Sequence, residues 1–469
     1  MIYQYLSDII KKVPSVQTGN IRYRISENLE KKRAKIFVID DDPTGIQTVH
    51  GCTLLTKWSV TLVKKALQGN SHLLYILSNS RSRSPEIARK LNLEIVESLI
   101  RANESCHYKL IIISRSDSTL RGHFPLETDA ILEKLHEHNI EVELPVFFVP
   151  ALLEAGRITA GNIQYMVEGD NLLPVARSEF ARDTLFGYKN SNLTDYIIEK
   201  SAGTLSRKKI GSISLEELRK LESPELQEKI TSLSGRRFLI INAVEYPDLH
   251  RFSFALTEMM GPADRAIIMR TSSSLPKALS GIPDKDLLTG QELGTGGSKG
   301  IFVIGSHVPR TTRQLNELLE NSEVEGIEID VMQILQDEET CFKQTMNALV
   351  HAFNRDKTPA LYTTRKELRS ENMDAAVHSG RKISGFLASV IKQLPISPSY
   401  IVSKGGITSH DILVDGLNVT SSTVSGQILP GVPVLKIRYE EKGRKIPFII
   451  FPGNVGGTGS LSELFKKLV

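Results

Sequence analysis

Short apolar runs recur along this chain, and longer stretches with helical spacing of apolar residues separate them. This alternation is typical of parallel strands that are buried by crossover helices, because such strands are apolar on both faces. We predict helices at residues 85 to about 101 and 374–394, the first beginning with Pro85 behind Ser84. We predict strands at residues 36–39, 73–77, 110–113, 146–149, 238–241, 301–304, 360–363, 400–402, 432–437 and 447–451. The predicted fold class is therefore α/β.

A glycine-rich segment separates the two groups of predicted strands. The chain has 469 residues, enough for about two to four domains. In TGQELGTGGSKG, residues 289–300, five of twelve residues are glycine and apolar periodicity is lost. Such a segment can hold phosphate, but this one precedes a strand instead of joining a strand to a helix, which favours a linker. We expect two domains, residues 36–288 and 301–469, each a largely parallel sheet flanked by helices.

Charge is unevenly distributed along the chain. The whole sequence has a net charge of +4, and its first 35 residues hold eight Lys or Arg against three Asp or Glu. We interpret residues 1–35 as a solvated basic N-terminal extension. Because the remaining sequence is balanced in charge, a nucleic-acid partner is not expected.

The lengths of the apolar runs and the positions of the cysteines indicate the cellular compartment of the protein. The longest apolar runs have four to six residues, too few to cross a bilayer, and the N-terminus lacks the uninterrupted apolar stretch of a signal peptide. The three cysteines are widely separated and lie outside any CxxC spacing, so neither a disulfide framework nor a zinc site is indicated. We expect a cytoplasmic protein with no membrane partner.

Three consecutive carboxylates follow the first predicted strand. Asp40, Asp41 and Asp42 stand at its carboxyl end, ahead of Pro43, Thr44 and Gly45. Adjacent carboxylates repel one another, and this cost is normally tolerated where a cation or a proton donor compensates. Ligands of open α/β sheets also bind at the carboxyl ends of strands. The segment therefore indicates a binding site, and a solvated turn capped by aspartate is the alternative interpretation.

Two further polar segments follow predicted strands in the same half. One runs from Ser114 to Gly122 as SRSDSTLRG, and the other, SNSRSRS, contains Arg81. Two guanidinium groups, a carboxylate and several hydroxyls in so short a stretch suit a small polyhydroxylated anion. Arg81 has the planar fork that binds a carboxylate through two hydrogen bonds, although an arginine that contacts only water is an equally common situation.

The second half carries glycine-containing segments next to its predicted strands. They are IGSHVP, SKGGITSHDIL, GQILPGVPVLKI and FPGNVGGTGSL. Glycine lets backbone N–H groups approach phosphate oxygens, and a helix that begins there adds a favourable dipole. Together these segments indicate a nucleotide, although a single glycine turn is weak evidence. The standard phosphate loop GxxxxGK[ST] does not occur in the sequence.

Taken together, these segments resemble the four-carbon acid sugar kinase family over nearly the whole chain. IDDDPTG is similar to the family's Ala-Asp-Asp-Leu-Thr-Gly box, residues 78–81 resemble its Thr-Asp-Ser-Arg box, and residues 115–122 resemble its long Lys-x-Asp-Ser-Thr-Leu-Arg-Gly box. The segment PALLEAGRITAGNIQYMVEG, with SEFARD after it, also resembles the family pattern after the fourth strand.

The resemblance implies a function and a division of labour. In the family the N-terminal domain binds the sugar acid, the C-terminal domain binds ATP, and transfer takes place in a ligand cleft between them. We therefore expect an ATP-dependent kinase that uses Mg²⁺ and phosphorylates a hydroxyl of a small sugar acid of about four carbons, such as threonate or erythronate. The sequence leaves the oligomeric state open, and we include a homodimer among the expected partners.

The same resemblance assigns site residues. The carboxylate near the attacking hydroxyl is expected to be Asp41 or Asp117, and the metal ligands stay unassigned. The substrate-binding residues implied are Asp41, Asp42, Arg81, Arg115, Ser116, Asp117 and Ser118. The nucleotide-binding residues implied are Ser306, Gly405, Gly406, Ile407, Thr408, Gly453, Asn454, Val455 and Gly456.

Several positions depart from the family pattern, all in the substrate half. Asp40 and Pro43 replace the usual alanine and leucine, Asn79 stands in place of aspartate, and Arg115 replaces lysine. An Arg fork is not equivalent to the point charge of Lys. These departures leave the particular sugar acid open.

Two other functions compete with this interpretation. An apolar strand followed by Asp40, Asp42 and Thr44 also resembles the first motif of haloacid-dehalogenase-type phosphatases, in which Asp40 would be the nucleophile and Asp42 the acid/base. That alternative leaves the C-terminal glycine segments without a role. The second alternative is a non-catalytic sensor that binds a nucleotide or a sugar acid without transferring phosphate.

Overall fold

The structure is a computed structural model in which two compact units can be described. It describes residues 4–16, 19–297, 299–306, 308–365, 373–439, 443–453 and 455–469, and for residues 373–378 the backbone only. Unit 1 is Met1–Asp284 and unit 2 is Lys285–Val469. Among the described residues, no helix is long and apolar enough to cross a membrane.

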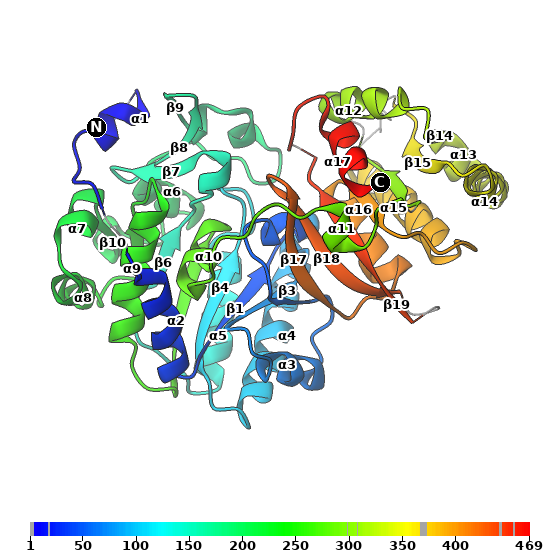
Figure 1. The fold of residues 1–469 in the computed structure, drawn as a ribbon. Helices are drawn as coiled ribbons and strands as arrows, with labels where there is room; N and C mark the ends of the chain where they lie inside the picture. Colours follow the sequence, from blue (N-terminus) through cyan, green and yellow to red (C-terminus); the bar gives the residue numbers. More distant parts are fainter. Residues whose placement is uncertain are drawn as a thin grey trace. The chain divides into compact units, whose positions relative to one another are not determined.

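Unit 1 is built on a parallel sheet with the strand order β10-β11-β6-β12-β4-β1-β3-β2, with the short β5 paired to β12 (Figure 1). Every residue of the central strand β1 is buried, as expected for a strand covered on both faces. The strands are β1 Ala34–Asp40, β2 Thr53–Leu55, β3 Leu73–Leu77, β4 Lys109–Arg115, β5 Glu141–Val142, β6 Val146–Val149, β10 Ile210–Ile213, β11 Phe238–Ile241 and β12 Arg265–Thr271.

Helices cover both faces of this sheet. Phe37 and Ile39 of β1 pack in one core with α3 Val60–Leu67, α4 Pro85–Asn103 and α5 Leu126–Glu137. The helices α2 Ile21–Lys31, α9 Tyr246–Met259 and α10 Ser274–Ser280 pack together, and α2 and α10 also contact β1. The remaining helices of the unit are α1 Leu6–Ile10, α6 Leu193–Lys200, α7 Leu215–Lys220 and α8 Ser223–Ser232.

A small antiparallel sheet is added to unit 1. It has the order β7-β8-β9 and a core of its own that includes Ile158, Tyr165 and Ile9 of α1. Its strands are β7 Arg157–Ala160, β8 Ile163–Glu168 and β9 Asn171–Pro174.

Unit 2 has a mixed sheet with the order β17-β18-β19-β16-β13-β15-β14. The pairs among β19, β16, β13, β15 and β14 are parallel, whereas β18 is antiparallel to both β17 and β19. The strands are β13 Ile301–Ile304, β14 Val324–Ile329, β15 Thr358–Thr363, β16 Ile401–Lys404, β17 Ser421–Leu429, β18 Val432–Tyr439 and β19 Arg444–Phe451. The helices are α11 Gly290–Leu293, α12 Pro309–Leu319, α13 Val331–Gln336, α14 Glu338–Asn354, α15 Met373–Lys392, α16 Gly406–Asp411 and α17 Ser460–Leu468.

The predicted α/β class is confirmed, with two units that each hold a mostly parallel sheet. The predicted linker at residues 289–300 is placed differently. The division falls between Asp284 and Lys285, and Leu288 is buried in the core of unit 2. A side chain at Gly290 would come within 2.3 Å of the Lys467 carbonyl oxygen, so this glycine serves close packing of α11.

The prediction that residues 1–35 form a solvated extension is wrong for the described residues. Ile25 and Leu29 of α2 are completely buried, and Lys35 already belongs to the central strand. The two apolar residues are four positions apart and share one helix face, whereas Arg24, Glu30 and Lys31 of the same helix are exposed.

Replacing Leu29 with Ala tests the role of α2. The buried side chain has no exposed surface, so its removal should lower the free energy of unfolding by about 2–5 kcal/mol. The control is Tyr23→Ala on the same helix. Because Tyr23 is 67% exposed, we expect this substitution to change the free energy of unfolding by no more than about 0.5 kcal/mol. Chemical denaturation of the full chain measures both, and equal effects would contradict the packing of α2.

Candidate functional site

Four neighbouring strands of unit 1 end at one edge of the sheet, and a polar segment follows or closes each of them. In the parallel register Asp40 of β1 stands beside Leu77 of β3 and Arg115 of β4, and Arg115 stands beside Thr271 of β12. The sequence segments that contain Asp40, Arg81 and Arg115 therefore meet, as carboxyl ends of parallel strands must. We call the polar side chains at this edge the acid-edge array.

Asp41 lies at the centre of the acid-edge array. Arg81 donates to both of its carboxylate oxygens, from Nη2 at 2.5 Å and from Nε at 3.0 Å, and Ser116 Oγ donates to Oδ2 at 2.6 Å. Arg115 Nη1 lies 3.5 Å from the other oxygen. Burial opposes ionisation, but Arg81 and Arg115 outweigh it and hold the pKa of Asp41 below its ordinary value. Asp41 is therefore an ionised carboxylate with both oxygens occupied.

Asp40 lies beneath this centre and is inaccessible. Its Oδ1 accepts a hydrogen bond from Arg115 Nη1 at 3.0 Å, and its Oδ2 is buried without a hydrogen-bond partner among the described residues. Burial raises the pKa of Asp40 to about 7, and the nearby Arg115 only partly offsets this. A side chain at Gly45 would come within 2.0 Å of Oδ2, so the chain closes directly over the carboxyl group.

The geometry at Asp40 argues against the phosphatase alternative. A nucleophile must reach its substrate, and the backbone at Gly45 closes directly over the buried Asp40 carboxyl group. Asp42, the acid/base of that alternative, uses Oδ1 to accept hydrogen bonds from Thr44 N at 2.8 Å and Thr44 Oγ1 at 2.5 Å. Asp42 therefore caps the short helical turn that follows it, as the capped-turn interpretation expected.

Asp117 is more accessible than Asp41, since 15% of its side chain is exposed against 2%. Its Oδ2 accepts hydrogen bonds from Arg121 Nε at 2.7 Å and from the Thr119 hydroxyl. Burial opposes ionisation, but Arg81 and Arg121 hold the pKa of Asp117 well below its usual range. No described residue donates to its Oδ1. Asp117 is therefore an ionised and partly exposed carboxylate.

The predicted substrate residues differ in how they take part in the acid-edge array. Asp41, Arg81, Arg115, Ser116 and Asp117 join one network of hydrogen bonds and electrostatic contacts, and Asp42 lies at its margin, 3.5 Å from Arg81 Nη1. Ser118 contributes differently, because its backbone carbonyl accepts a hydrogen bond from Gln164 Nε2 at 3.0 Å.

A buried ion pair that sequence reasoning missed supports the array. Arg270 Nη1 of β12 lies 2.6 Å from Glu127 Oε2, and Ser80 Oγ donates to Glu127 Oε1 at 2.6 Å. Gly122 packs against both the acid-edge array and this ion pair, because a side chain there would meet Ser116 Oγ at 2.4 Å and Arg270 Nη2 at 3.1 Å. The only sequence signal was an arginine at the end of an apolar run, which is too common to select Arg270.

Unit 2 also gathers polar groups at the carboxyl edge of its parallel strands. The loops after β13, β16 and β19 approach one another, since a side chain at Gly405 would lie 3.6 Å from Ser306 Cβ and one at Gly453 would lie 3.9 Å from Ser306 Oγ. Gly405 has a φ of +116°, which favours glycine. We call this region the glycine edge.

The other predicted nucleotide residues lie in the same loops. Gly406 and Ile407 begin α16, and a side chain at Gly305 would meet Thr408 Oγ1 at 2.4 Å. Gln314 Nε2 of α12 fixes the last loop by donating to the carbonyl oxygens of Val455 at 3.1 Å and Gly457 at 2.9 Å. Gly456 has a φ of +82° in that loop, and Asn454 lies outside the described residues.

Cations that the sequence interpretation did not select lie at the glycine edge. Lys404 ends β16 and donates from Nζ to the Pro452 carbonyl at 2.7 Å. Arg365 follows β15 and donates to the carbonyl oxygens of Ser306 and of Thr363. No group of three or more metal-ligating side chains occurs among the described residues in either unit.

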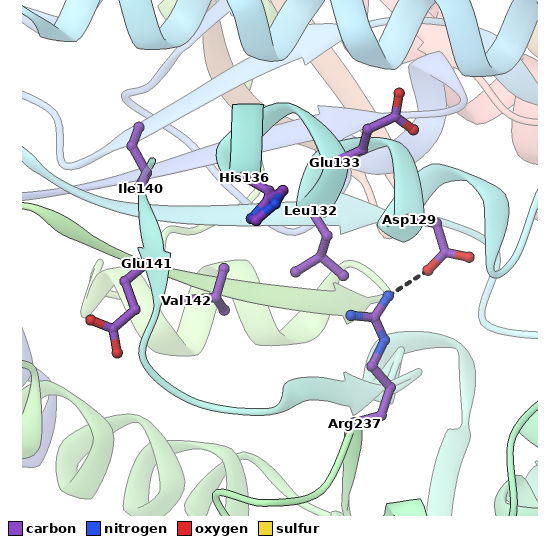
Figure 2. Close-up of a pocket in the computed structure, with 8 residues that line it drawn as sticks. All are labelled: Asp129, Leu132, Glu133, His136, Ile140, Glu141, Val142 and Arg237. Atoms are coloured by element: carbon purple, nitrogen blue, oxygen red, sulfur yellow. Dashed lines mark hydrogen bonds and ion pairs between the residues drawn. The ribbon is translucent and has the colours of Figure 1, made fainter. Parts of the chain in front are cut away.

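A pocket elsewhere in unit 1 contains none of the predicted site residues (Figure 2). Its lining comes from α5, from β5 and the residue before it, and from the residue before β11: Asp129, Leu132, Glu133, His136, Ile140, Glu141, Val142 and Arg237. Each acid there has a basic partner, such as Arg237 Nη2 at 2.6 Å from Asp129. We do not assign this pocket to the function.

Comparison with protein families identifies the domains that carry these two edges. Residues 36–279 match the family description "Sugar-binding N-terminal domain", and residues 301–461 match "Nucleotide-binding C-terminal domain". The fold and the two edges thus define a protein that joins a sugar-binding to a nucleotide-binding domain, an arrangement that fits a kinase-type enzyme. The chain belongs to the four-carbon acid sugar kinase family.

Solved structures agree on the fold. Protein HI1011 of Haemophilus influenzae, of the family DUF1537, is 20% identical, with a TM-score of 0.65 over 92% of this chain and 100% of its own. The provisionally named tRNA synthase of Salmonella typhimurium LT2 is 16% identical, with a TM-score of 0.66 over 92% of this chain and 98% of its own. No curated protein matches the chain.

The raised pKa of Asp40 predicts a pH-dependent stability. Because the folded state holds the proton more tightly than the unfolded chain, Asp40 destabilises the fold increasingly as pH rises from about 4 to about 7, and not further above that. Asp40→Asn removes this ionisation. Its free energy of unfolding relative to the natural protein should rise by up to about 4 kcal/mol over this range. A difference that is constant with pH, measured by urea denaturation, would contradict the buried state of Asp40.

Proposed function

We propose that the protein is an ATP-dependent kinase that phosphorylates a hydroxyl of a small sugar acid of about four carbons, such as threonate or erythronate. The observation that carries the proposal is the acid-edge array in the sugar-binding domain. It combines the Arg81 guanidinium, which can bind a carboxylate, with the ionised Asp117 oxygen, which can accept a hydrogen bond from a hydroxyl.

Asp117 and Asp41 have distinct proposed roles. Asp117 is the carboxylate that accepts the hydrogen bond of the attacking hydroxyl, because its Oδ1 carries no hydrogen bond from a described residue. Asp41 orients Arg81 through two hydrogen bonds, and Arg115 and Ser116 act through Asp41. Phosphoryl transfer depends mainly on positioning and charge, so a strongly basic carboxylate is not needed.

We further propose that the glycine edge holds ATP. Ser306, Gly405 to Thr408 and Gly453 to Gly456 would surround its phosphates, because backbone N–H groups at glycine turns can approach phosphate oxygens. Mg²⁺ would enter with the nucleotide, since it is usually bound through phosphate oxygens and one or two carboxylates instead of a dedicated protein cage. The absence of a cluster of metal ligands among the described residues fits this mode of binding.

The proposed function also implies a cellular compartment and a set of partners. We place the reaction in the cytoplasm, where ATP is available, and the three cysteines Cys52, Cys106 and Cys341 are buried and unpaired. The balanced charge beyond residue 35 argues against nucleic acid as a partner. A homodimer stays a prediction.

Asp117→Asn tests the proposed role of Asp117. Loss of the ionised oxygen should lower kcat for sugar-acid phosphorylation by about 10²- to 10⁴-fold and leave the KM for ATP nearly unchanged. A coupled assay of ADP formation measures both. The control is Asp129→Asn, at a side chain that is 51% exposed on α5, which should keep full turnover. Full turnover by Asp117→Asn would transfer the catalytic assignment to Asp41.

Gly405→Val tests the assignment of ATP to unit 2. Valine cannot easily adopt the φ of +116° and would place its side chain against Ser306, so the KM for ATP should rise about tenfold or more while the KM for the sugar acid changes little. Gly385→Val on α15 is the control, because no atom lies within 4 Å of the added Cβ. A larger rise in the KM for the sugar acid would overturn the domain assignment.

A further inference from the structure

Lys404 is a buried basic residue without an anionic partner among the described residues. It is 0% exposed at the end of β16, and its Nζ has one hydrogen bond, to the Pro452 carbonyl at 2.7 Å. The same atom lies 4.1 Å from the centre of the Phe451 ring. No carboxylate of the described chain comes within ion-pair distance of it.

The other buried lysines are better satisfied. Lys35 Nζ donates to two carbonyl oxygens, of Gly69 at 2.6 Å and of Ser71 at 2.7 Å. Lys109 Nζ lies 3.0 Å from Glu143 and donates to the Pro262 carbonyl at 2.9 Å. A buried ammonium group is costly unless it is paired. Among the buried lysines that the structure describes, the single hydrogen bond of Lys404 is therefore an exception.

The electrostatics and the position of Lys404 both suit an anion beside its Nζ. Burial lowers its pKa to about 7, and the positive charge of Arg310 on α12 acts in the same direction. Arg365, which also has no ion pair with a described residue, donates to the Ser306 carbonyl at the same edge. Lys404 directly precedes Gly405, and its Nζ bonds to the carbonyl oxygen of Pro452, which directly precedes Gly453. Backbone N–H groups at such glycine turns suit phosphate oxygens.

We propose that Lys404 binds a phosphate group of the nucleotide and takes up a proton as that phosphate binds. The inference rests on the proposed nucleotide site and adds to it a residue that senses the ligand's charge. In the absence of ligand, burial and Arg310 favour the neutral amine. A phosphate beside Nζ reverses this balance and draws a proton from the solvent onto the amine, with no covalent bond formed or broken.

Calorimetry of ADP binding to the full chain tests the proposal. At pH 8, roughly nine in ten molecules of a lysine with a pKa near 7 are neutral, while the ADP phosphates are already ionised. The binding enthalpy, measured in two buffers of different ionisation enthalpy, should reveal uptake of close to one proton per ADP, and clearly less at pH 6. Adenosine, which lacks phosphate, should bind without proton uptake.

Lys404→Met should abolish the proton uptake and weaken ADP binding by about 10- to 100-fold. Because the substitution replaces a buried polar amine that has one hydrogen bond by an apolar side chain of similar length, the ligand-free protein should keep or gain thermal stability. The matched control is Lys343→Met, at an exposed lysine of α14, which should retain both affinity and uptake.

The outcomes separate this inference from the proposed function. ADP binding without proton uptake, or uptake that persists in Lys404→Met, would overturn the role of Lys404 and leave the kinase proposal intact. Uptake with adenosine would overturn the assignment to phosphate. Failure of the natural protein to bind either ADP or ATP would instead overturn the nucleotide site on which the inference rests.

Discussion

The ion pair between Asp41 and Arg81 ties together the edge of the sheet on which the proposed chemistry depends. Asp41 follows β1 and Arg81 follows β3, while Ser116, from the end of β4, donates to the same carboxylate. Parallel pairing of these strands brings the three segments together, and the carboxylate fixes their side chains in one arrangement. A rigid array of this kind is what phosphoryl transfer asks of a protein, because it limits the motion of the reacting groups.

Two departures from the family pattern are explained by their contact. Asp40 and Arg115 stand where the family pattern has alanine and lysine, and their side chains lie 3.0 Å apart. The extra carboxyl group is thus matched by a guanidinium that also bonds to Ser273 at 3.1 Å and approaches Asp41. Since both side chains are almost fully buried, they shape the support of the array and do not by themselves alter the surface that a sugar acid would meet.

Sequence patterns predicted strands well where apolar runs were uninterrupted, as at β3 and β6, whose bounds match the prediction. They failed where the signal was mixed. In the segment GQILPGVPVLKI, the strand predicted at residues 432–437 lies in β18, but the glycine-containing residues before it form the end of the antiparallel strand β17 and the turn to β18. Residues 1–35 were misjudged because their many charges hid the apolar stripe of α2.

The candidate site was only partly predictable for a related reason. Motifs indicated Asp41, Arg81 and Asp117, since these residues are crowded into short polar segments after strands. Glu127, Arg270 and Lys404 lie outside such signals, and their importance arises from burial and from partners far away in the sequence. No local pattern distinguishes a buried lysine with one hydrogen bond from an exposed one. The contrast between Asp117 and Asp41 likewise needed the accessibility of each carboxylate.

The most direct measurement is mass spectrometry of the products formed from Mg-ATP and a panel of four- to six-carbon sugar acids. The proposed function predicts an acid that becomes heavier by one phosphoryl group, together with one ADP for each product molecule. ATP binding with no phosphorylated acid from any member of the panel would contradict the kinase proposal and favour the non-catalytic sensor. Release of inorganic phosphate from a phosphate ester in the absence of ATP would also contradict it, and would restore the phosphatase alternative despite the burial of Asp40.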